Sequence, residues 1–178
     1  MKFIQEYETT EVYGESKPFP VGPQVCKITN VTDVPEKSYL MVEFDIIEGE
    51  LKDYFKTLYE HTEKWYGVTY RSYKLNALPY FKAFIAAVEK SNPGYNWNWN
   101  ENELIGKILV VNFREEEYIY NNEIKVNVKP FEFRSLLALK EGKINLKPDK
   151  LSLRPEELAS FSSQKPVLEE IPDDELPF

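Results

Sequence analysis

The sequence predicts a mainly β domain in which five strands form a small barrel, with one helix between the third and fourth strands and a disordered acidic tail at the end. Two observations carry the fold class: five stretches have the alternation or composition of strands, and one stretch, 76–90, repeats its apolar residues at helical spacing. A third observation sets the tail apart. Residues 162–178 are largely Ser, Pro and acidic residues, a composition that does not build a core.

Three strands are predicted in the first half of the chain. Residues 24–32 alternate apolar and polar side chains, and residues 38–47 do so with Leu40, Val42, Phe44 and Ile46 on one face. The two segments are expected to pair as a hairpin. Residues 51–59 have helical spacing but also suit an extended excursion, and residues 65–75, rich in Tyr, Val and Thr, predict the third strand.

The helix and the last two strands follow. Asn76 is the expected N-cap of the helix, Pro79 lies in its first turn, and residues 91–94 end it. Residues 108–114 predict the fourth strand, and the acidic run 115–117 is expected to turn. Residues 118–120 and 124–128 then predict a hairpin across 121–123.

This order divides the chain into three parts. Residues 1–20 read as an irregular arm, 21–150 as the folded domain, and 151–178 as a tail with one short helix near 154–161. A helix between the third and fourth of five strands is the arrangement of an OB-fold, a partly open barrel whose face binds oligonucleotides. Other small β-folds also admit one helix, so the order alone leaves them open.

Composition limits the classes of protein that fit. The single cysteine, Cys26, excludes an intramolecular disulfide, and no segment approaches the roughly 20 apolar residues of a membrane span. We therefore expect a soluble cytoplasmic protein. The net charge of −8 argues against nucleic acid, but residues 151–178 carry a net −5, which leaves the rest of the chain close to neutral.

The sequence offers little catalytic chemistry and predicts no enzyme and no cofactor. His61 is the only histidine and stands in a polar, Tyr-rich stretch typical of a surface, and no glycine-rich phosphate-binding motif occurs. Glu43 and Asp45, with Glu48 and Glu50 just beyond, could be compared with the carboxylates of a magnesium-dependent nuclease. Their alternation with the apolar residues favours a solvated strand face instead.

Rings and positive charges occur together in several regions. Single-stranded nucleic acid exposes flat bases and phosphates, which bind aromatic rings and Lys or Arg respectively. The predicted DNA-binding residues are Tyr54, Phe55, Trp65, Tyr66, Tyr70, Arg71, Tyr73, Lys74, Trp97, Trp99, Lys107, Arg114, Tyr118, Tyr120, Lys125 and Lys129. The alternative for any one ring is that it packs in the core.

The chain ends in EEIPDDELPF, residues 169–178. This end resembles the C-terminal tip of bacterial-type single-stranded DNA-binding proteins, in which an acidic run and a terminal Phe dock on basic, apolar pockets of replication, recombination and repair proteins. The resemblance implies that such proteins are partners. The residues expected to bind them are Asp173, Asp174, Glu175, Leu176, Pro177 and Phe178.

A second resemblance covers most of the body. Residues 44–50 (FDIIEGE), 54–55 (YF), 91–95 (SNPGY) and 104–107 (LIGK) are similar to a family of small proteins from phages and prophages of Gram-positive bacteria. That family implies non-specific single-stranded DNA binding in phage replication and recombination, in the host cytoplasm. A homo-oligomer, an adaptor that uses the tail without binding DNA, and more distantly a metal-dependent nuclease remain open.

Overall fold

The computed structural model describes residues 2–5, 7 and 18–164. The predicted partner-binding residues 173–178 and most of the expected arm, 1–20, therefore lie outside the described residues. Within them the structure is mainly β, as predicted, and no helix there is long and apolar enough to cross a membrane.

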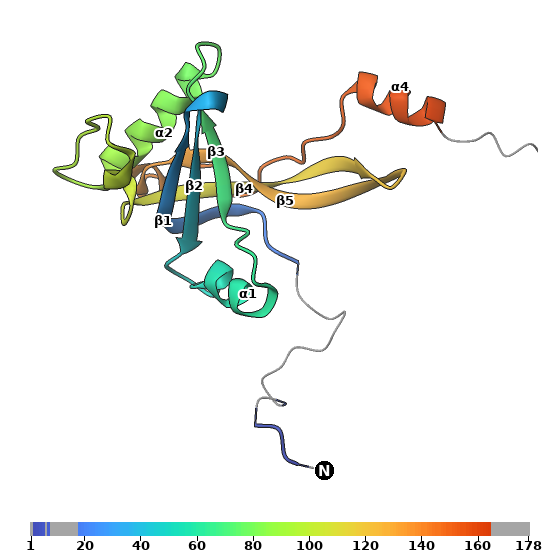
Figure 1. Ribbon diagram of the computed structural model, residues 1–178, viewed down its shortest axis with the longest axis horizontal. Coiled ribbons are helices and arrows are strands. Elements are labelled where there is room, and N and C mark those ends of the chain that lie inside the picture. The colour runs from blue at the N-terminus through green and yellow to red at the C-terminus, as the bar shows by residue number, and fades with distance from the viewer. Residues whose placement is uncertain (1, 6, 8–17, 165–178) are drawn as a thin grey trace, which may run out of the picture.

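Five antiparallel strands make one sheet in the order β3-β2-β1-β4-β5. They are β1 Gly22–Val34, β2 Tyr39–Ile46, β3 Val68–Ser72, β4 Ile108–Tyr120 and β5 Glu123–Arg134. The pairing joins β1 to both β2 and β4, so the sheet has β3 and β5 at its edges, and no hydrogen-bonded pairing among the described residues closes it. Figure 1 shows β4 and β5 continuing as a long hairpin well beyond the other strands.

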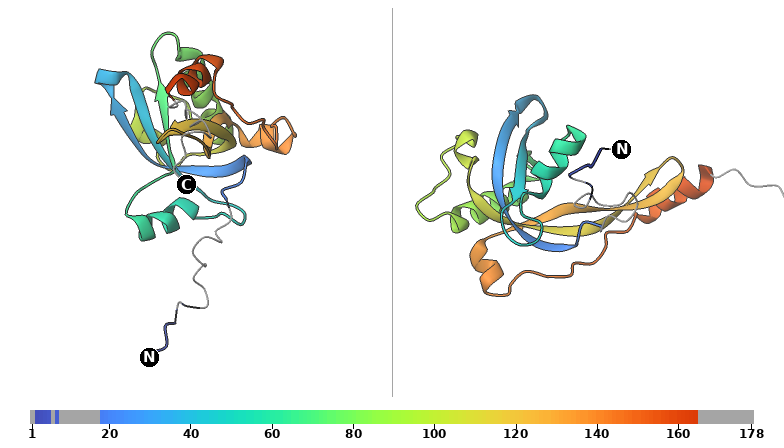
Figure 2. Two further views of the ribbon diagram at one scale, coloured as in Figure 1. Left: turned by 90° about the vertical axis from the view of Figure 1, so that its right-hand side faces the viewer. Right: turned by 90° about the horizontal axis from the view of Figure 1, so that it is seen from below.

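Helices surround the sheet. The α-helices are α1 Tyr54–Thr62, α2 Leu78–Ser91, α3 Leu136–Lys140 and α4 Pro155–Gln164, and two 3-10 turns span η2 Pro35–Lys37 and η3 Glu101–Leu104. The helix α2 lies between β3 and β4 in the chain, as predicted, with Pro79 in its first turn. Its N-cap is Ala77, which makes no side-chain cap bond, so the prediction of Asn76 as the cap was wrong. In Figure 2 α4 lies beside the outer part of the β4–β5 hairpin, far from α2.

The main core lies between the sheet and α2. The predicted apolar face of β2 is confirmed, since Leu40, Val42, Phe44 and Ile46 are all buried, and Phe84 and Val88 of α2 join the same cluster. Apolar burial of this kind, about 25 cal/mol per Å², is the dominant favourable term in folding. The core therefore fixes the part of the sheet from which the hairpin extends.

Asp45 corrects one prediction about this strand. It was expected on a solvated face, but it is buried, and its carboxylate accepts hydrogen bonds from the backbone amides of Ile46 at 2.8 Å, Phe55 at 2.9 Å and Lys56 at 3.1 Å. Phe55 and Lys56 stand in the first turn of α1, whose amides have no partner within the helix. A side chain ten residues away thus supplies the cap that Asp53, the local N-cap residue, does not.

The acidic run at 115–117 also differs from the prediction. Instead of turning, it lies inside β4, which continues to Tyr120 and pairs with β5 along its whole outer length. The turn lies at Asn121 and Asn122, whose φ angles are +49° and +59°. Two successive residues at positive φ define the tight turn that matches the twist of paired strands, and Asn tolerates it.

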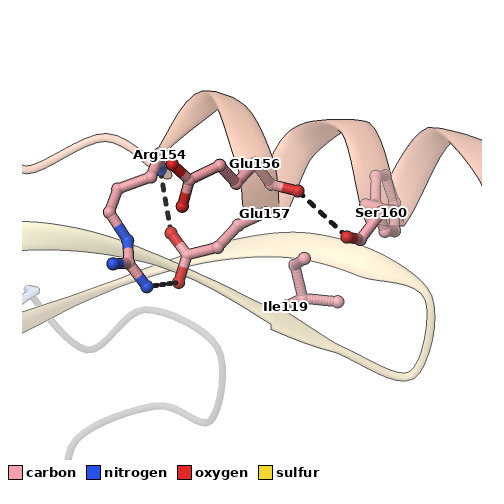
Figure 3. A pocket seen from close by; sticks show the side chains of 6 residues that line it. Ile119, Arg154, Glu156, Glu157 and Ser160 are labelled. Carbon is pink, nitrogen blue, oxygen red and sulfur yellow. Dashed lines mark hydrogen bonds and ion pairs between the residues drawn. The ribbon is translucent and has the colours of Figure 1, made fainter.

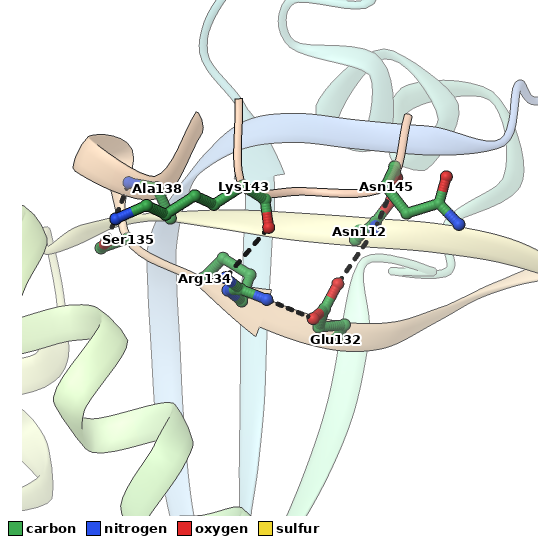
Figure 4. Close-up of polar contacts among 7 residues, drawn as sticks. All are labelled: Asn112, Glu132, Arg134, Ser135, Ala138, Lys143 and Asn145. Carbon is green, nitrogen blue, oxygen red and sulfur yellow. Dashed lines mark hydrogen bonds and ion pairs between the residues drawn. The ribbon is translucent and has the colours of Figure 1, made fainter. Parts of the chain in front are cut away.

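A polar cluster holds the chain after α3 against the base of the hairpin (Figure 4). The Asn112 side-chain amide donates to the Asn145 carbonyl and to Glu132, both at 3.1 Å, and Arg134 donates to Glu132 at 2.8 Å and to the Lys143 carbonyl at 3.1 Å. Asn112 is fully buried. The cluster directs the following residues along the free edge of β4.

Candidate nucleic-acid interface

The register of the β4–β5 hairpin brings five predicted DNA-binding residues onto one face. Arg114 lies opposite Lys129, and Tyr118 lies opposite Lys125. Directly opposed residues of antiparallel strands point to the same side, as do residues two apart on one strand. Arg114, Tyr118, Tyr120, Lys125 and Lys129 therefore share one side of the ribbon, which we call the basic-aromatic face.

Rings and cations alternate closely on this face. The Lys125 ammonium lies 5.0 Å from the centre of the Tyr120 ring, and the Arg114 guanidinium lies 4.6 Å from that of Phe131. Tyr120 is exposed, with 55% of its surface accessible, whereas Tyr118 is half-buried. A cation over an aromatic ring at an exposed site gains about 0.5–1 kcal/mol, so the Tyr120 and Phe131 rings each lie beside a positive charge.

Alternation also sorts the charges of the hairpin. The basic-aromatic face carries three cations and two carboxylates, Glu116 and Glu123, which pair with Arg114 at 3.2 Å and Lys125 at 3.8 Å. Glu115 and Glu117 point to the opposite side. Lys129 is exposed and forms no ion pair with any described residue. The face is thus net positive although β4 and β5 together carry more acids than bases.

The free edge of β4 and the opposite side of the hairpin are braced by the residues that follow α3. Leu151 exchanges backbone hydrogen bonds with Glu115 and Glu117 of β4. Glu117 also accepts hydrogen bonds from Lys150 at 2.5 Å and from the Leu153 amide at 3.2 Å. The bond from Lys150 is the largest cause, and that from Leu153 the next, of a Glu117 pKa below the ordinary value. The brace leaves the basic-aromatic face uncovered by this segment.

The helix α4 completes the brace near the turn. Figure 3 shows Ile119, which points away from the basic-aromatic face, directed toward α4, where Glu157 accepts from the backbone amide and the guanidinium of Arg154. The space between hairpin and helix is about 340 Å³. A two-stranded ribbon alone is marginally stable in water, so these contacts explain how so long a hairpin keeps its shape.

The predicted residues of the third strand divide into buried and accessible ones. The Trp65 indole donates to the Gly67 carbonyl at 3.1 Å, and the Tyr73 hydroxyl donates to Asp33 at 2.9 Å. The rings of both residues pack on the core. Tyr66, Tyr70 and Lys74 are the exposed members of this region, with Tyr66 and Tyr70 about half accessible.

Three other predicted residues are less accessible than Tyr66, Tyr70 and Lys74; they are Arg71, Tyr54 and Phe55. The Arg71 guanidinium sits 4.5 Å from the centre of the Phe133 ring of β5, and burial lowers its pKa, although guanidinium keeps its charge at ordinary pH. Phe55 is in the core and only 6% exposed, and Tyr54 packs beside it against the Phe19 ring. These side chains support the sheet rather than line its surface.

The remaining predicted residues lie at the α2 side of the molecule. Trp97 and Trp99 stand 6.0 Å apart, ring centre to ring centre, in the loop before η3, and Lys107 lies over the Tyr95 ring at 4.7 Å. The structure therefore separates the predicted set into the hairpin face, the exposed residues around β3, and the tryptophan loop. Sequence reasoning missed Tyr39, whose ring meets Tyr70 at 5.3 Å, because nothing local marks it.

The described residues contain no group of three or more His, Cys, Asp or Glu side chains that could hold a metal ion. His61 is exposed on α1, as expected, and its Nδ1 lies 2.8 Å from the Thr57 carbonyl. No known family model matches the chain, and no curated protein matches it either.

Proposed function

We propose that this protein binds single-stranded DNA without sequence specificity, and that the basic-aromatic face of the β4–β5 hairpin is its main contact. The observation that carries the proposal is the register, which places Arg114, Tyr118, Tyr120, Lys125 and Lys129 on one side of a braced ribbon. Stacking of a base on an aromatic ring is worth about 1–3 kcal/mol and tolerates any base. The cations between the rings suit the phosphates that join successive bases.

The fold proposed with this function is an OB-type barrel open between β3 and β5. The strand order, the position of α2 between β3 and β4, and the contact between Arg71 and Phe133 across the two edges all support it. OB-folds bind oligonucleotides on the barrel face and with the loops that follow strands 1 and 4. The hairpin occupies the position of the second of these loops, which agrees with its proposed role.

A role in phage replication and recombination, inside the host cell, completes the proposal, with the acidic tip at 173–178 recruiting partner proteins. The charge distribution supports it: the tip is acidic, the hairpin face is basic, and the two suit different ligands. An adaptor that uses the tip without binding DNA is the alternative. The overall charge of −8 favours it.

A titration distinguishes the two. The full chain is added to a fluorescent oligo-dT and to a duplex of the same length, at about 50 and 200 mM salt. The matched variants are Tyr118→Ala with Tyr120→Ala, and Tyr80→Ala, a 72% exposed tyrosine on α2. We expect single-strand binding that weakens with salt, falls at least about tenfold in the hairpin variant and is unchanged in the control. Absence of binding at low salt would favour the adaptor.

A further inference from the structure

The outer part of β5 forms an unpaired edge of the sheet. β5 is the last strand in the order β3-β2-β1-β4-β5, and its residues 123–129 pair with β4 on one side only. No described residue forms a hydrogen bond with the backbone of the other side, and the hairpin projects beyond the body of the domain (Figure 1). An unpaired edge presents a row of amide and carbonyl groups that can pair with a strand of another chain.

The register shows which backbone groups lie on this edge. On β4, the Glu115 carbonyl and the Glu117 amide point away from β5, because both bond to Leu151. In an antiparallel pair, opposed residues either bond to each other or both direct their backbone groups outward. The residues opposite Glu115 and Glu117 therefore point outward on β5, and so does every second residue along that strand. The outward amides and carbonyls are those of Ile124, Val126 and Val128.

The side chains of these three residues are apolar and β-branched. Ile124 and Val126 are 42% and 48% exposed, and Val128 is half-buried. All three lie on the side of the ribbon opposite the basic-aromatic face. Pairs of β-branched residues on neighbouring strands stabilise a sheet. The edge thus offers both free backbone groups and an apolar row to an added strand.

The sequence of this edge is complementary to itself. When two copies of β5 are paired antiparallel about Val126, every outward amide and carbonyl of one copy meets an outward group of the other. Charges of opposite sign also meet, and Lys129 is available for this because it is exposed and forms no ion pair with any described residue. The opposed residues are Val126 and Val126, Ile124 and Val128, Glu123 and Lys129, and Lys125 and Asn127.

Neighbouring registers lack this complementarity. A pair centred on Lys125 places two lysines directly opposite each other, which is destabilising. A pair centred on Asn127 places Lys125 opposite Lys129 and Ile124 opposite Pro130, which has no amide hydrogen to donate. The edge therefore favours one register, and the strand that fits it is a second copy of β5.

We propose that two copies of this chain associate through antiparallel pairing of their β5 strands about Val126. The two hairpins then form one continuous sheet in the order β4-β5-β5-β4. A pairing this short belongs to the small interfaces, below about 1,200 Å², that hold weak complexes. The basic-aromatic faces of both copies lie on the same side of the joined sheet, because opposed residues of antiparallel strands point to the same side. That shared platform for DNA rests on the proposed function, whereas the pairing itself does not.

Sedimentation velocity of the full chain without DNA, from about 1 µM to about 1 mM, tests the pairing over the weak range of specific binding. We expect a reversible equilibrium between monomer and dimer. Val126→Lys should weaken the dimer at least about tenfold, because two lysines then face each other at the centre of the interface. Leu137→Lys, which replaces an exposed apolar residue of α3, is the matched control and should leave the equilibrium unchanged.

A charge exchange tests the register. Glu123→Lys should weaken the dimer at least about fivefold, and adding Lys129→Glu should restore it to within about twofold, because opposite charges then meet again. Circular dichroism checks that each variant remains folded. A monomer at every concentration, a dimer that Val126→Lys leaves intact, or a double variant as weak as Glu123→Lys alone would overturn the proposal. A chain that dimerises in this way but does not bind oligo-dT would overturn the proposed function alone, so the two proposals fail separately.

Discussion

Replacing Asp45 tests how the domain holds α1, and it separates a structural carboxylate from a catalytic one. The side chain accepts from two buried amides, of Ile46 and Phe55, and from the part-buried amide of Lys56. Asp45→Ala leaves these donors without an acceptor, at about 1–3 kcal/mol for each that water cannot reach. Two amides stay buried without an acceptor and water partly replaces the acceptor of the third, so we expect the free energy of unfolding to fall by about 3–5 kcal/mol.

Asp45→Asn should cost less. The amide oxygen of the new side chain can replace Oδ1, which serves Ile46 and Phe55, but its NH₂ group faces the Lys56 amide where Oδ2 stood. One lost bond and the lost charge correspond to about 1–2 kcal/mol. The control is Glu43→Ala, two residues earlier on the same strand, which should change the free energy of unfolding by no more than about 0.5 kcal/mol.

Urea unfolding followed by circular dichroism measures these differences. With a slope of about 2 kcal/mol per M urea, Asp45→Ala should lower the midpoint by about 2 M and the Asn variant by about half as much or less. Equal midpoints for Asp45→Ala and the unchanged chain would refute the reasoning. A loss of DNA cleavage on this substitution, with stability retained, would instead revive the metal-dependent nuclease.

Three further predictions follow from the surfaces. Lys129→Gln should make the slope of log K for oligo-dT binding against log salt concentration shallower by about 0.7, which is the value of one phosphate contact to a single strand. The control Lys143→Gln should leave this slope unchanged, because Lys143 is paired with Glu141 and lies outside the hairpin. Glu117→Gln should accelerate hydrogen exchange at the Leu151 amide with little change in global unfolding, because it weakens the brace only; unchanged exchange would show that the backbone bonds suffice. Trp99→Gly should change the free energy of unfolding by no more than about 1 kcal/mol, because glycine adopts the φ of +65° at this position without strain; a larger loss of stability in urea would show that the Trp99 ring contributes to packing.

The elements packed on the core could be predicted from the sequence. The strands β1 and β2 and the helix α2 each bury one face, so their apolar residues recur with the period of the element. The outer half of β4 could not be predicted in this way. Neither side of the ribbon there faces the core, and three consecutive glutamates in an exposed strand look the same as a polar turn.

The first turn of α1 shows a second limit. Its amides are capped by Asp45 from another element, while Asp53 at the local N-cap has a left-handed backbone and forms no cap bond. The sequence around 51–59 therefore lacks the usual start signal of a helix. An acceptor supplied from a neighbouring strand appears only once the fold is known.

The candidate site was accessible to sequence reasoning by residue type but not by arrangement. The mixture of rings and cations at 114–129 was visible, yet which of them share a face depends on the turn at Asn121 and Asn122, which sets the register. Likewise, the loop with Trp97 and Trp99 was visible as an unusual segment, whereas the cleft that it forms with α2 depends on tertiary packing.

The central claim is that single-stranded DNA lies on the basic-aromatic face of the hairpin. Photocrosslinking the full chain to an oligo-dT that carries 5-iododeoxyuridine, followed by mass spectrometry of the digested adduct, tests it most directly. We predict adducts at Tyr118, Tyr120 or Phe131, the rings on this face or against its cations. Adducts confined to other parts of the chain, or a protein that forms none while remaining folded, would contradict it.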